Sequence, residues 1–301
     1  MYDRPMPYGE PIFFKGEYIK DSSYPLFVIA IKCQFEMKDN HLPTIQLKNS
    51  RFFAENEYLE SSEGEAVCMI LTSIDYELFF QHYNVWDVEY NGGWKFKAYD
   101  GFFKDYINKW YKVKQQATLD GNAGMRTLSK LMLNSLYGKF ASAPTGKSKI
   151  PYYEDRVKYA TGPLENRKAL YIPIGSFITA WARYTTITAA QKLYDRFCYA
   201  DTDSLHLLGT DIPTEIDVDP TKLGAWKHES TFTRARFLRS KSYIEEIDGE
   251  LKITCAGLPK RCHQFVTWDN FLPGNSFQGK LIPKHVDGGI VLAETEFTLR
   301  K

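Results

Sequence analysis

Between residues 124 and 140, apolar and polar side chains repeat with the period of an α-helix. The apolar ones recur at spacings of three, four and four residues and share one face: Met125, Leu128, Met132 and Leu136. The polar ones recur at spacings of four, four and three and share the opposite face: Arg126, Lys130, Asn134 and Tyr137. The pattern predicts an amphipathic helix with an apolar stripe towards the core and an accessible polar face.

Upstream of this helix, the pattern favours β structure over residues 12–110. Extended apolar runs such as 26–35 and 44–47 are separated there by Pro, Asn and Gly-Gly turn signals. A short helical segment is predicted around residues 75–83.

Helices and strands are mixed in the rest of the chain. We predict a helix over residues 102–114, a loop over 115–122 and a second long helix over 176–196. Segments that favour strands follow in this order: a polar, hairpin-like stretch at 142–173, a strand, tight turn and strand at 197–208, and terminal runs near 290–292 and 296–299. The predicted fold class is α+β.

Composition narrows the possible classes of protein. The 301 residues suggest about two domains at roughly 150 residues each. The formal net charge is only +1, so affinity for nucleic acid must come from local clusters of cations. The 20 Tyr, 20 Phe and 6 Trp fit either aromatic-rich β structure or surfaces on which bases stack.

Cysteine usage and hydropathy predict a soluble protein of the cytoplasm with no membrane partner. The five cysteines lack framework spacing, which favours a reducing compartment. Cys255, Cys262 and His263 lack the second close pair of ligands typical of a structural zinc site. No apolar run approaches the ~20 residues of a membrane span, and the N-terminus has no signal-peptide pattern.

Residues 199–204, Tyr-Ala-Asp-Thr-Asp-Ser, lie between two apolar runs. This places Asp201 and Asp203 at or near the tip of a β-hairpin. Side chains two residues apart on an extended chain point the same way, so both carboxylates would face one cation. Such hard oxygen ligands suit Mg²⁺, although an arbitrary Asp-x-Asp is usually a solvated turn. The residues that follow lack the ligands and the Gly of an EF-hand.

The polar face of the helix over 124–140 offers two cations, an amide and a phenol. Arg126 and Lys130 would suit a triphosphate, and Tyr137 would pack on a base or sugar. Gly138 would let another chain approach closely. The alternative is an exposed helix face that binds nothing.

A third motif, Lys241-Ser242-Tyr243, closes a basic segment about forty residues after the aspartates. The segment contains a single acid, Glu229, and six cations: Lys222, Lys227, Arg234, Arg236, Arg239 and Lys241. Their excess indicates either a site for a phosphodiester backbone or a solvated basic face.

The three motifs occur in an order that resembles B-family DNA polymerases. Residues 130–138 match motif B in its K-x-x-x-N-S-x-Y-G form, residues 199–204 match motif C (Y-x-D-T-D-S), and residues 241–243 match the K-x-Y motif. The surrounding sequence is similar to the small protein-primed polymerases of Bacillus phages along essentially the whole chain, including residues 8–11, 177–184 and 297–299.

This resemblance implies a right-hand architecture of palm, fingers and thumb with two β-rich insertions. In chain order it implies a remnant of the N-terminal palm (1–11), an insertion like terminal protein region 1 (12–101), fingers (102–141), an insertion like terminal protein region 2 (142–173), palm (174–254) and thumb (255–301). In the family, the first insertion helps to bind terminal protein and duplex. The second closes a tunnel around the DNA, which gives processivity and strand displacement.

The resemblance also implies roles for the residues that match its motifs. Asp201 and Asp203 would be the palm carboxylates near two catalytic Mg²⁺ ions, which Mn²⁺ would be able to replace. Tyr137 would pack against the nascent base pair, and three cations would hold the incoming triphosphate: Lys114, Arg126 and Lys130. Contacts with the template and primer would come from Asn134, Ser135, Gly138, Lys241 and Tyr243.

The implied activity is template-directed DNA synthesis from a primer 3′-hydroxyl or a hydroxyl of terminal protein. The implied partners are DNA, deoxynucleoside triphosphates and terminal protein. The sequence departs from the family in two ways: it contains no D-x-x-S-L-Y-P (motif A), and no segment matches the 3′–5′ exonuclease domain. Because motif A normally lies just upstream of the residues matching 1–11, we expect a chain that begins after a catalytic aspartate, as a split gene, a fragmentary reading frame or a deliberate truncation would produce. The alternative to an active enzyme is an incomplete subunit, whose partner would be a separate chain carrying motif A and the exonuclease.

Two other functions remain open. The chain would be a binding module if it encloses DNA or terminal protein without performing chemistry alone. A reverse transcriptase or RNA polymerase is disfavoured by the Asp-Thr-Asp order and the K-x-Y segment.

Overall fold

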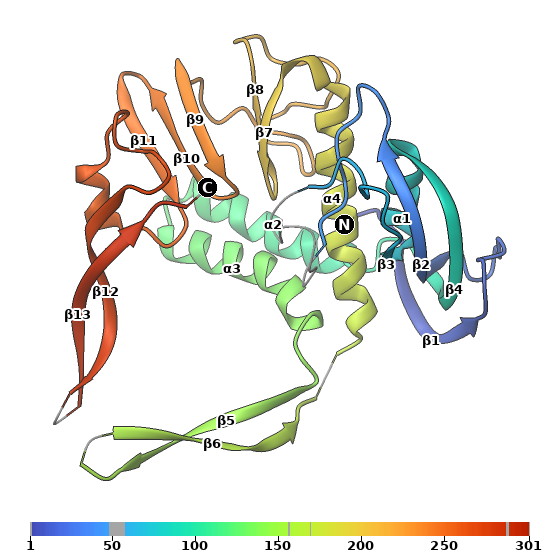
Figure 1. The fold of residues 1–301 in the computed structure, drawn as a ribbon, viewed down its shortest axis with the longest axis horizontal. Coiled ribbons are helices and arrows are strands. Elements are labelled where there is room, and N and C mark those ends of the chain that lie inside the picture. The colour runs from blue at the N-terminus through green and yellow to red at the C-terminus, as the bar shows by residue number, and fades with distance from the viewer. Residues whose placement is uncertain (1, 48–57, 156, 169, 287–288, 301) are drawn as a thin grey trace.

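The computed structural model describes residues 2–47, 58–155, 157–168, 170–286 and 289–300. Its helices and strands are mixed, with a sheet from the N-terminal part on one side, strands from the C-terminal part on the other and helices between them (Figure 1). The predicted α+β class is confirmed.

An antiparallel sheet in the order β1-β4-β2-β3 forms the N-terminal side. Its strands are β1 (Met6–Phe14), β2 (Leu26–Met37), β3 (Val67–Thr72) and β4 (Tyr83–Tyr99). Alternate residues of β2 are buried, as expected for one face of a strand, and they pack with Phe79 of α1 (Ser73–His82). The apolar run 26–35 and the helix predicted near 75–83 are thereby confirmed.

Residues 44–47, which were expected to be extended like the run 26–35, belong to no strand. The hydroxyl of Tyr83 accepts hydrogen bonds from the backbone N–H groups of Thr44 and Ile45, at 2.8 and 3.4 Å. These groups therefore find a side-chain acceptor instead of a strand partner. Ile45 is buried in the core of the sheet, which accounts for the apolar character of the segment.

Helix α4 (Ile172–Lys192) is central and contacts α1, α3, β1 and β3. Its buried side chains join those of the sheet in a second core that includes Met6, Leu26, Phe96, Phe177, Ile178 and Trp181. The prediction of a helix over 176–196 is wrong at both ends. The helix starts earlier because Pro173 is tolerated in the first turn, and a 3₁₀ turn, Tyr194–Arg196, follows its end.

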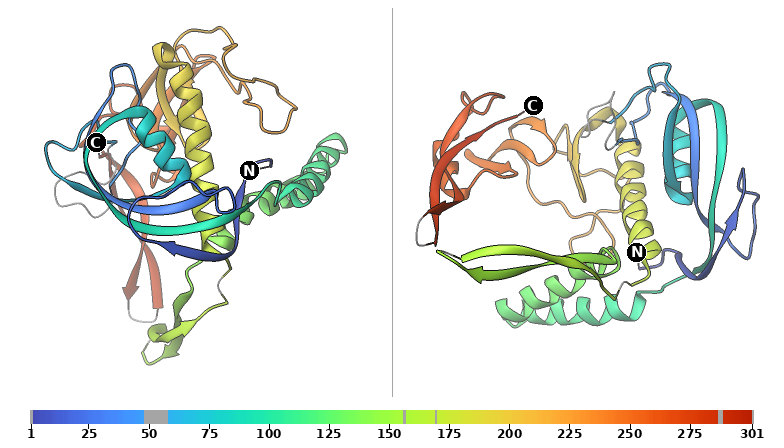
Figure 2. Two further views of the ribbon diagram at one scale, coloured as in Figure 1. Left: turned by 90° about the vertical axis from the view of Figure 1, so that its right-hand side faces the viewer. Right: turned by 60° about the horizontal axis from the view of Figure 1, so that its bottom comes forward.

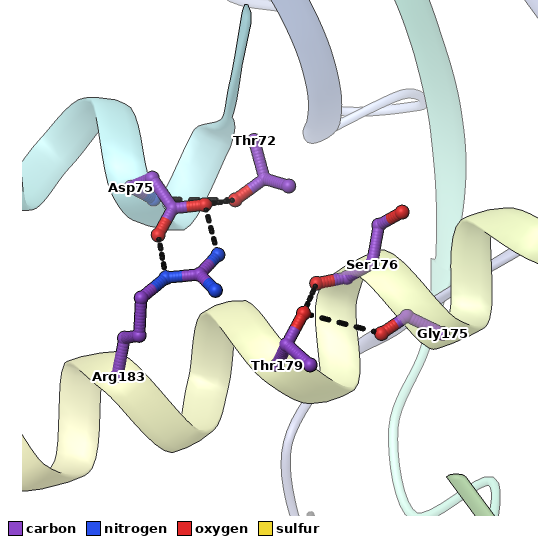
Figure 3. Close-up of polar contacts among 6 residues, drawn as sticks. All are labelled: Thr72, Asp75, Gly175, Ser176, Thr179 and Arg183. Carbon is purple, nitrogen blue, oxygen red and sulfur yellow. Dashed lines mark hydrogen bonds and ion pairs between the residues drawn. The ribbon is translucent and has the colours of Figure 1, made fainter. Parts of the chain in front are cut away.

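An ion pair joins α4 to α1 (Figure 3). Arg183 donates from Nε and Nη2 to the two carboxylate oxygens of Asp75, each at 2.8 Å. Thr72 caps α1, since its Oγ1 accepts the Asp75 N–H at 3.2 Å and donates to Asp75 Oδ2 at 2.8 Å. Burial disfavours the charged guanidinium, but the hydrogen bonds and charge of Asp75 prevail and raise the pKa of Arg183.

We expect Asp75→Asn to lower the free energy of unfolding by about 1–2 kcal/mol, because a bidentate pair and an acidic group at the start of a helix are both lost. The two side chains are 15% and 42% exposed, so the loss should exceed that of a fully solvated pair. Urea denaturation measures the change, with Glu77→Gln on the exposed face of α1 as the matched control. A loss no greater than that of the control would contradict the role of this contact.

Helices α2 (Lys104–Leu119) and α3 (Ala123–Phe140) pack against each other. The predicted loop over 115–122 is wrong, because α2 continues to Leu119. Ala117 is buried there, and the Thr118 hydroxyl donates to the carbonyl of Lys114 at 2.8 Å. A turn of only a few residues remains between the helices.

The apolar stripe predicted for α3 is only partly buried. Met125 and Leu128 are 40% and 44% exposed, whereas Leu133, Leu136 and Phe140 pack on the second core. The C-terminal half of α3 therefore lies against the body of the molecule, and the N-terminal half extends beyond it. The predicted helix itself is confirmed, and its polar face is exposed as expected: Arg126, Lys130, Asn134 and Tyr137.

The two hairpins predicted in the middle of the chain are present. Strands β5 (Thr145–Tyr153) and β6 (Val157–Asn166) form the first, and β7 (Phe197–Asp201) and β8 (Ser204–Leu207) form the second. The first is a long arm that extends towards the C-terminal strands in each view of Figures 1 and 2.

The C-terminal part holds a third core between two further sheets. Strands β9 (Arg234–Arg239), β10 (Ser242–Ile247) and β11 (Glu250–Cys255) form one sheet, and a 3₁₀ helix (Lys260–Phe265) leads to β12 (Ser276–Val286) and β13 (Gly289–Thr298). The strands predicted near 290–292 and 296–299 are present, but they are not separate. They form one strand, because β12 pairs with β13 along its whole length.

Candidate functional site

The β7–β8 hairpin carries both aspartates at its tip, as predicted. Asp201 ends β7 and is partly buried, whereas Asp203 lies in the turn and is exposed. The N–H of Asp203 donates to the carbonyl of Asp201 at 2.7 Å, which closes a γ-turn around Thr202. Thr202 has φ of 55°, in the left-handed region that β-branched residues rarely adopt.

The γ-turn removes the reason for which Asp201 and Asp203 were expected to face one cation. The alternation of side chains along an extended chain does not apply, because Asp201 and Asp203 flank a tight turn. Their relative direction is set by the conformation of Thr202 and by the contacts that hold it.

The K-x-Y segment lies directly against this hairpin. The hydroxyl of Tyr199, two residues before Asp201, accepts the backbone N–H of Lys241 at 2.8 Å. The Tyr199 ring stacks on Phe237, with centroids 4.6 Å apart and planes inclined by 15°, and lies 5.3 Å from the ring of Tyr243. The fold thus joins two motifs that are far apart in the sequence.

The two phenols beside Asp201 are neutral at pH 7, as ordinary tyrosines are. Burial raises the pKa of Tyr199 and of Tyr243 further, and the charge of Asp201 adds to both shifts. Neutral phenols retain their hydrogen-bond donors at neutral pH. Behind them His206 stacks on Tyr199, and its Nε2 lies 3.7 Å from Glu245 Oε1; burial lowers the pKa of this imidazole and raises that of the carboxyl.

The polar face of α3 is open to a ligand. Lys130 is exposed, and Lys114 of α2 is partly buried. A Cβ added at Gly138 would meet no atom within 4 Å, so space remains beside this turn of the helix. Ser135 differs from its neighbours because its hydroxyl already donates to the carbonyl of Met132, at 3.2 Å.

Helix α4 connects the two parts of the site, because it packs against both α3 and the β7–β8 hairpin (Figure 1). A Cβ added at Gly175 would lie 3.1 Å from Ala141, so this glycine permits the close approach of α4 to the end of α3. Among the described residues, no hydrogen bond or ion pair joins the polar face of α3 directly to Asp201 or Asp203.

Comparison with known proteins decides the family. Residues 1–220 match the model of DNA polymerase type B, organellar and viral. The DNA polymerase of Bacillus phage phi29 is 48% identical over 322 residues, and that of Streptococcus phage Cp-1 is 34% identical over 315 residues. Each match covers 100% of this chain.

The chain belongs to the B-type DNA polymerase family.

A solved structure agrees with this assignment. Phi29 DNA polymerase in a ternary complex with primer-template DNA and incoming nucleotide superimposes with a TM-score of 0.94 at 47% identity. The match covers 100% of this chain and 55% of the phi29 chain. This B-type polymerase chain therefore spans about half the length of the phage relatives that it matches. The match to the Cp-1 enzyme likewise covers 54% of that protein. The resemblance to small phage polymerases is confirmed.

Sequence reasoning assigned no role to two residues of α4 in this polymerase chain. Arg183 pairs with Asp75, and Thr186 donates from Oγ1 to the carbonyl of Thr202 at 2.9 Å. The sequence did hold one indication of the first contact. Arg183 is a cation within a mostly apolar helix, and a charge that is partly buried requires a partner. Nothing in the sequence distinguished Thr186 from its neighbour Thr185.

The cysteines considered for zinc make other contacts. The thiol of Cys262 donates to the carbonyl of Gln278 at 3.2 Å, and Cys255 lies 3.7 Å from the hydroxyl of Ser242. In the described part of the chain, no three His, Cys, Asp or Glu side chains are grouped as metal ligands. No helix within the described ranges is long and apolar enough to cross a membrane.

Proposed function

We propose that this chain performs template-directed DNA synthesis, adding deoxynucleotides to a primer 3′-hydroxyl or to a hydroxyl of terminal protein. The observation that supports this most strongly is the position of α4, which contacts both the exposed polar face of α3 and the aspartate hairpin. A nucleotide on α3 and a cation at the hairpin would then act on one primer end. The phi29 relative, whose ternary complex holds primer-template DNA and incoming nucleotide, supports the same substrates.

The donor set at the hairpin fits Mg²⁺. Asp201 and Asp203 provide hard carboxylate oxygens at an accessible tip, and Mg²⁺ in such sites commonly keeps positions for water and phosphate oxygens. Two bound ions, Mg²⁺ or Mn²⁺, would supply charge neutralisation for in-line phosphoryl transfer. The protein's part is to hold the two carboxylates at a fixed separation.

The remaining residues bind and orient the substrates. Lys130, Lys114 and Arg126 hold the triphosphate through charge-assisted hydrogen bonds, and Tyr137 packs against the nascent base pair. Asn134, Ser135 and Gly138 lie near the template, and Ser135 would have to exchange its helical hydrogen bond to contact it. The neutral phenol of Tyr243 and the ammonium of Lys241 steady the primer terminus. The terminus would then lie next to Asp201, because the backbone N–H of Lys241 donates to the hydroxyl of Tyr199, two residues before Asp201.

The subdomains follow the family's order. We assign palm to residues 1–11 and 174–254, fingers to 102–141 and thumb to 255–301. Residues 12–101 and 142–173 are insertions of the kind called terminal protein regions 1 and 2. The β5–β6 arm, which extends towards β12–β13, would help to enclose DNA, and terminal protein would be a partner in the host cytoplasm.

A second candidate is a DNA-binding or terminal-protein-binding subunit that is catalytically incomplete. It is favoured by the absence, among the described residues, of a third acidic or metal-ligating side chain grouped with the two aspartates. The sequence also contains no D-x-x-S-L-Y-P. Motif A would then have to be supplied from outside these 301 residues to complete the site.

Primer extension separates the two candidates. The purified chain is given a labelled primer–template, deoxynucleotides and Mg²⁺ or Mn²⁺, alone or with the part of a phage relative that lies outside the match. Extension by the chain alone supports the first candidate, and extension only in the supplemented reaction supports the second. Binding of neither primer–template nor nucleotide would refute both.

A further inference from the structure

Hydroxyl groups hold the γ-turn that carries Asp203. Thr202 Oγ1 donates to Asp201 Oδ1 at 3.0 Å, and Ser204 Oγ donates to the Asp201 carbonyl at 3.1 Å. Both bonds lie within the hairpin and move with it. Thr186 reaches the turn from outside, since its Oγ1 donates to the Thr202 carbonyl at 2.9 Å.

The use of this hydroxyl differs from that of nearby threonines in α4. A helical threonine commonly donates to a carbonyl one turn earlier in its own helix. Thr185 does so, to Trp181 at 2.9 Å, and Thr179 does so, to Ser176 at 2.8 Å (Figure 3). The hydroxyl of Thr186 is directed instead to the hairpin that carries the aspartates.

Thr186 is well placed to fix the hairpin because α4 is itself immobilised. Phe177 and Ala190 are 0% and 2% exposed on this helix, and the indole N–H of Trp181 donates to the carbonyl of Pro5 at 3.0 Å. A hydroxyl on such a helix defines a fixed point for the turn. Without it, Thr202 would have less to hold it in a left-handed conformation that is unfavourable for its side chain.

We propose that Thr186 is a positioning residue for the metal-binding turn. Its hydrogen bond to the Thr202 carbonyl fixes the peptide between the two aspartates and hence the direction in which Asp203 presents its carboxylate to the cation. The inference rests on the proposed function in so far as Asp201 and Asp203 bind metal. The fixing of the turn itself is independent of that function.

Amide hydrogen exchange tests the fixing of the turn. The Asp203 N–H, which donates to Asp201, should exchange about 3- to 10-fold faster in Thr186→Val, because one hydrogen bond that supports the turn is lost. Thr186→Ser should restore the original rate, and Thr185→Val should leave it unchanged. If Thr186→Val fails to fold, Thr186→Ala replaces it. An Asp203 exchange rate unaffected by loss of the hydroxyl would overturn the proposal.

Dependence on Mg²⁺ tests the consequence for chemistry. In primer extension, Thr186→Val should raise the half-saturating Mg²⁺ concentration about 3- to 10-fold while leaving the nucleotide KM unchanged, and Thr186→Ser should reverse the effect. Faster amide exchange with an unchanged Mg²⁺ requirement would refute the positioning role. If neither the original chain nor the supplemented reaction extends a primer, the proposed function fails, and amide exchange alone decides whether Thr186 fixes the turn.

Discussion

Replacing Asp203 with asparagine is expected to lower the rate of nucleotide incorporation by roughly a thousandfold, in the chain alone or in the supplemented reaction. A carboxylate that neutralises developing phosphate charge through a metal contributes several kcal/mol, and each 1.4 kcal/mol corresponds to a tenfold change in rate. Asn is nearly isosteric, so the hairpin should keep its conformation. The same result is expected for Asp201→Asn. Single-turnover incorporation into a labelled primer measures the effect.

Two controls make this prediction specific. Primer–template affinity, measured by fluorescence anisotropy, should change little, because neither carboxylate is assigned to the DNA backbone. Asp211→Asn alters another exposed acidic residue shortly after β8 and should leave incorporation unchanged. Undiminished incorporation by either of the first two variants would refute the assignment of the aspartates.

Lys130→Ala is expected to raise the nucleotide KM by about 10- to 100-fold, because a charge-assisted hydrogen bond to a phosphate contributes about 1.5–3 kcal/mol. Steady-state incorporation at varied nucleotide concentration measures this change. Binding of primer–template should be nearly unaffected, since the lost contact belongs to the triphosphate.

The matched control for this variant is Lys139→Ala. Lys139 is also exposed on α3, but it lies nine residues further on and therefore about 180° around the helix from Lys130. Equal effects of the two substitutions would mean that the general charge of the helix matters and that Lys130 makes no specific phosphate contact.

Local patterns in the sequence were sufficient to predict the helix and the hairpin that carry motifs B and C. The 3.6-residue period predicted α3 and its exposed polar face, and apolar runs around a short polar segment predicted the β7–β8 hairpin. Both features depend on neighbouring residues alone. The order of the three motifs then indicated the family, which the comparisons confirm.

Contacts between segments far apart in the sequence could not be predicted from such local patterns. The Tyr199 hydroxyl meets the Lys241 N–H, and Arg183 meets Asp75, only because the fold brings these segments together. The exposure of Met125 has the same origin: its apolar side chain fits a buried stripe, but the half of α3 that carries it extends beyond the core. Periodicity defines a face of a helix and does not say how much of its length is covered.

The conformation of Thr202 escaped prediction for a different reason. A β-branched residue is disfavoured at positive φ, so local propensity argues against the observed γ-turn. The turn is held by hydrogen bonds, one of which comes from α4. Conflict between local preference and observed conformation is expected where function constrains the backbone, and here it falls between the two proposed metal ligands.

The most direct test of the account is the position of metal and nucleotide in a crystal of this chain with primer–template, a non-hydrolysable deoxynucleotide and Mn²⁺. The account predicts anomalous Mn²⁺ density within about 2.0–2.3 Å of carboxylate oxygens of Asp201 and Asp203, with a triphosphate between the ion and Lys130. Mn²⁺ bound elsewhere, or a triphosphate away from the polar face of α3, would contradict it.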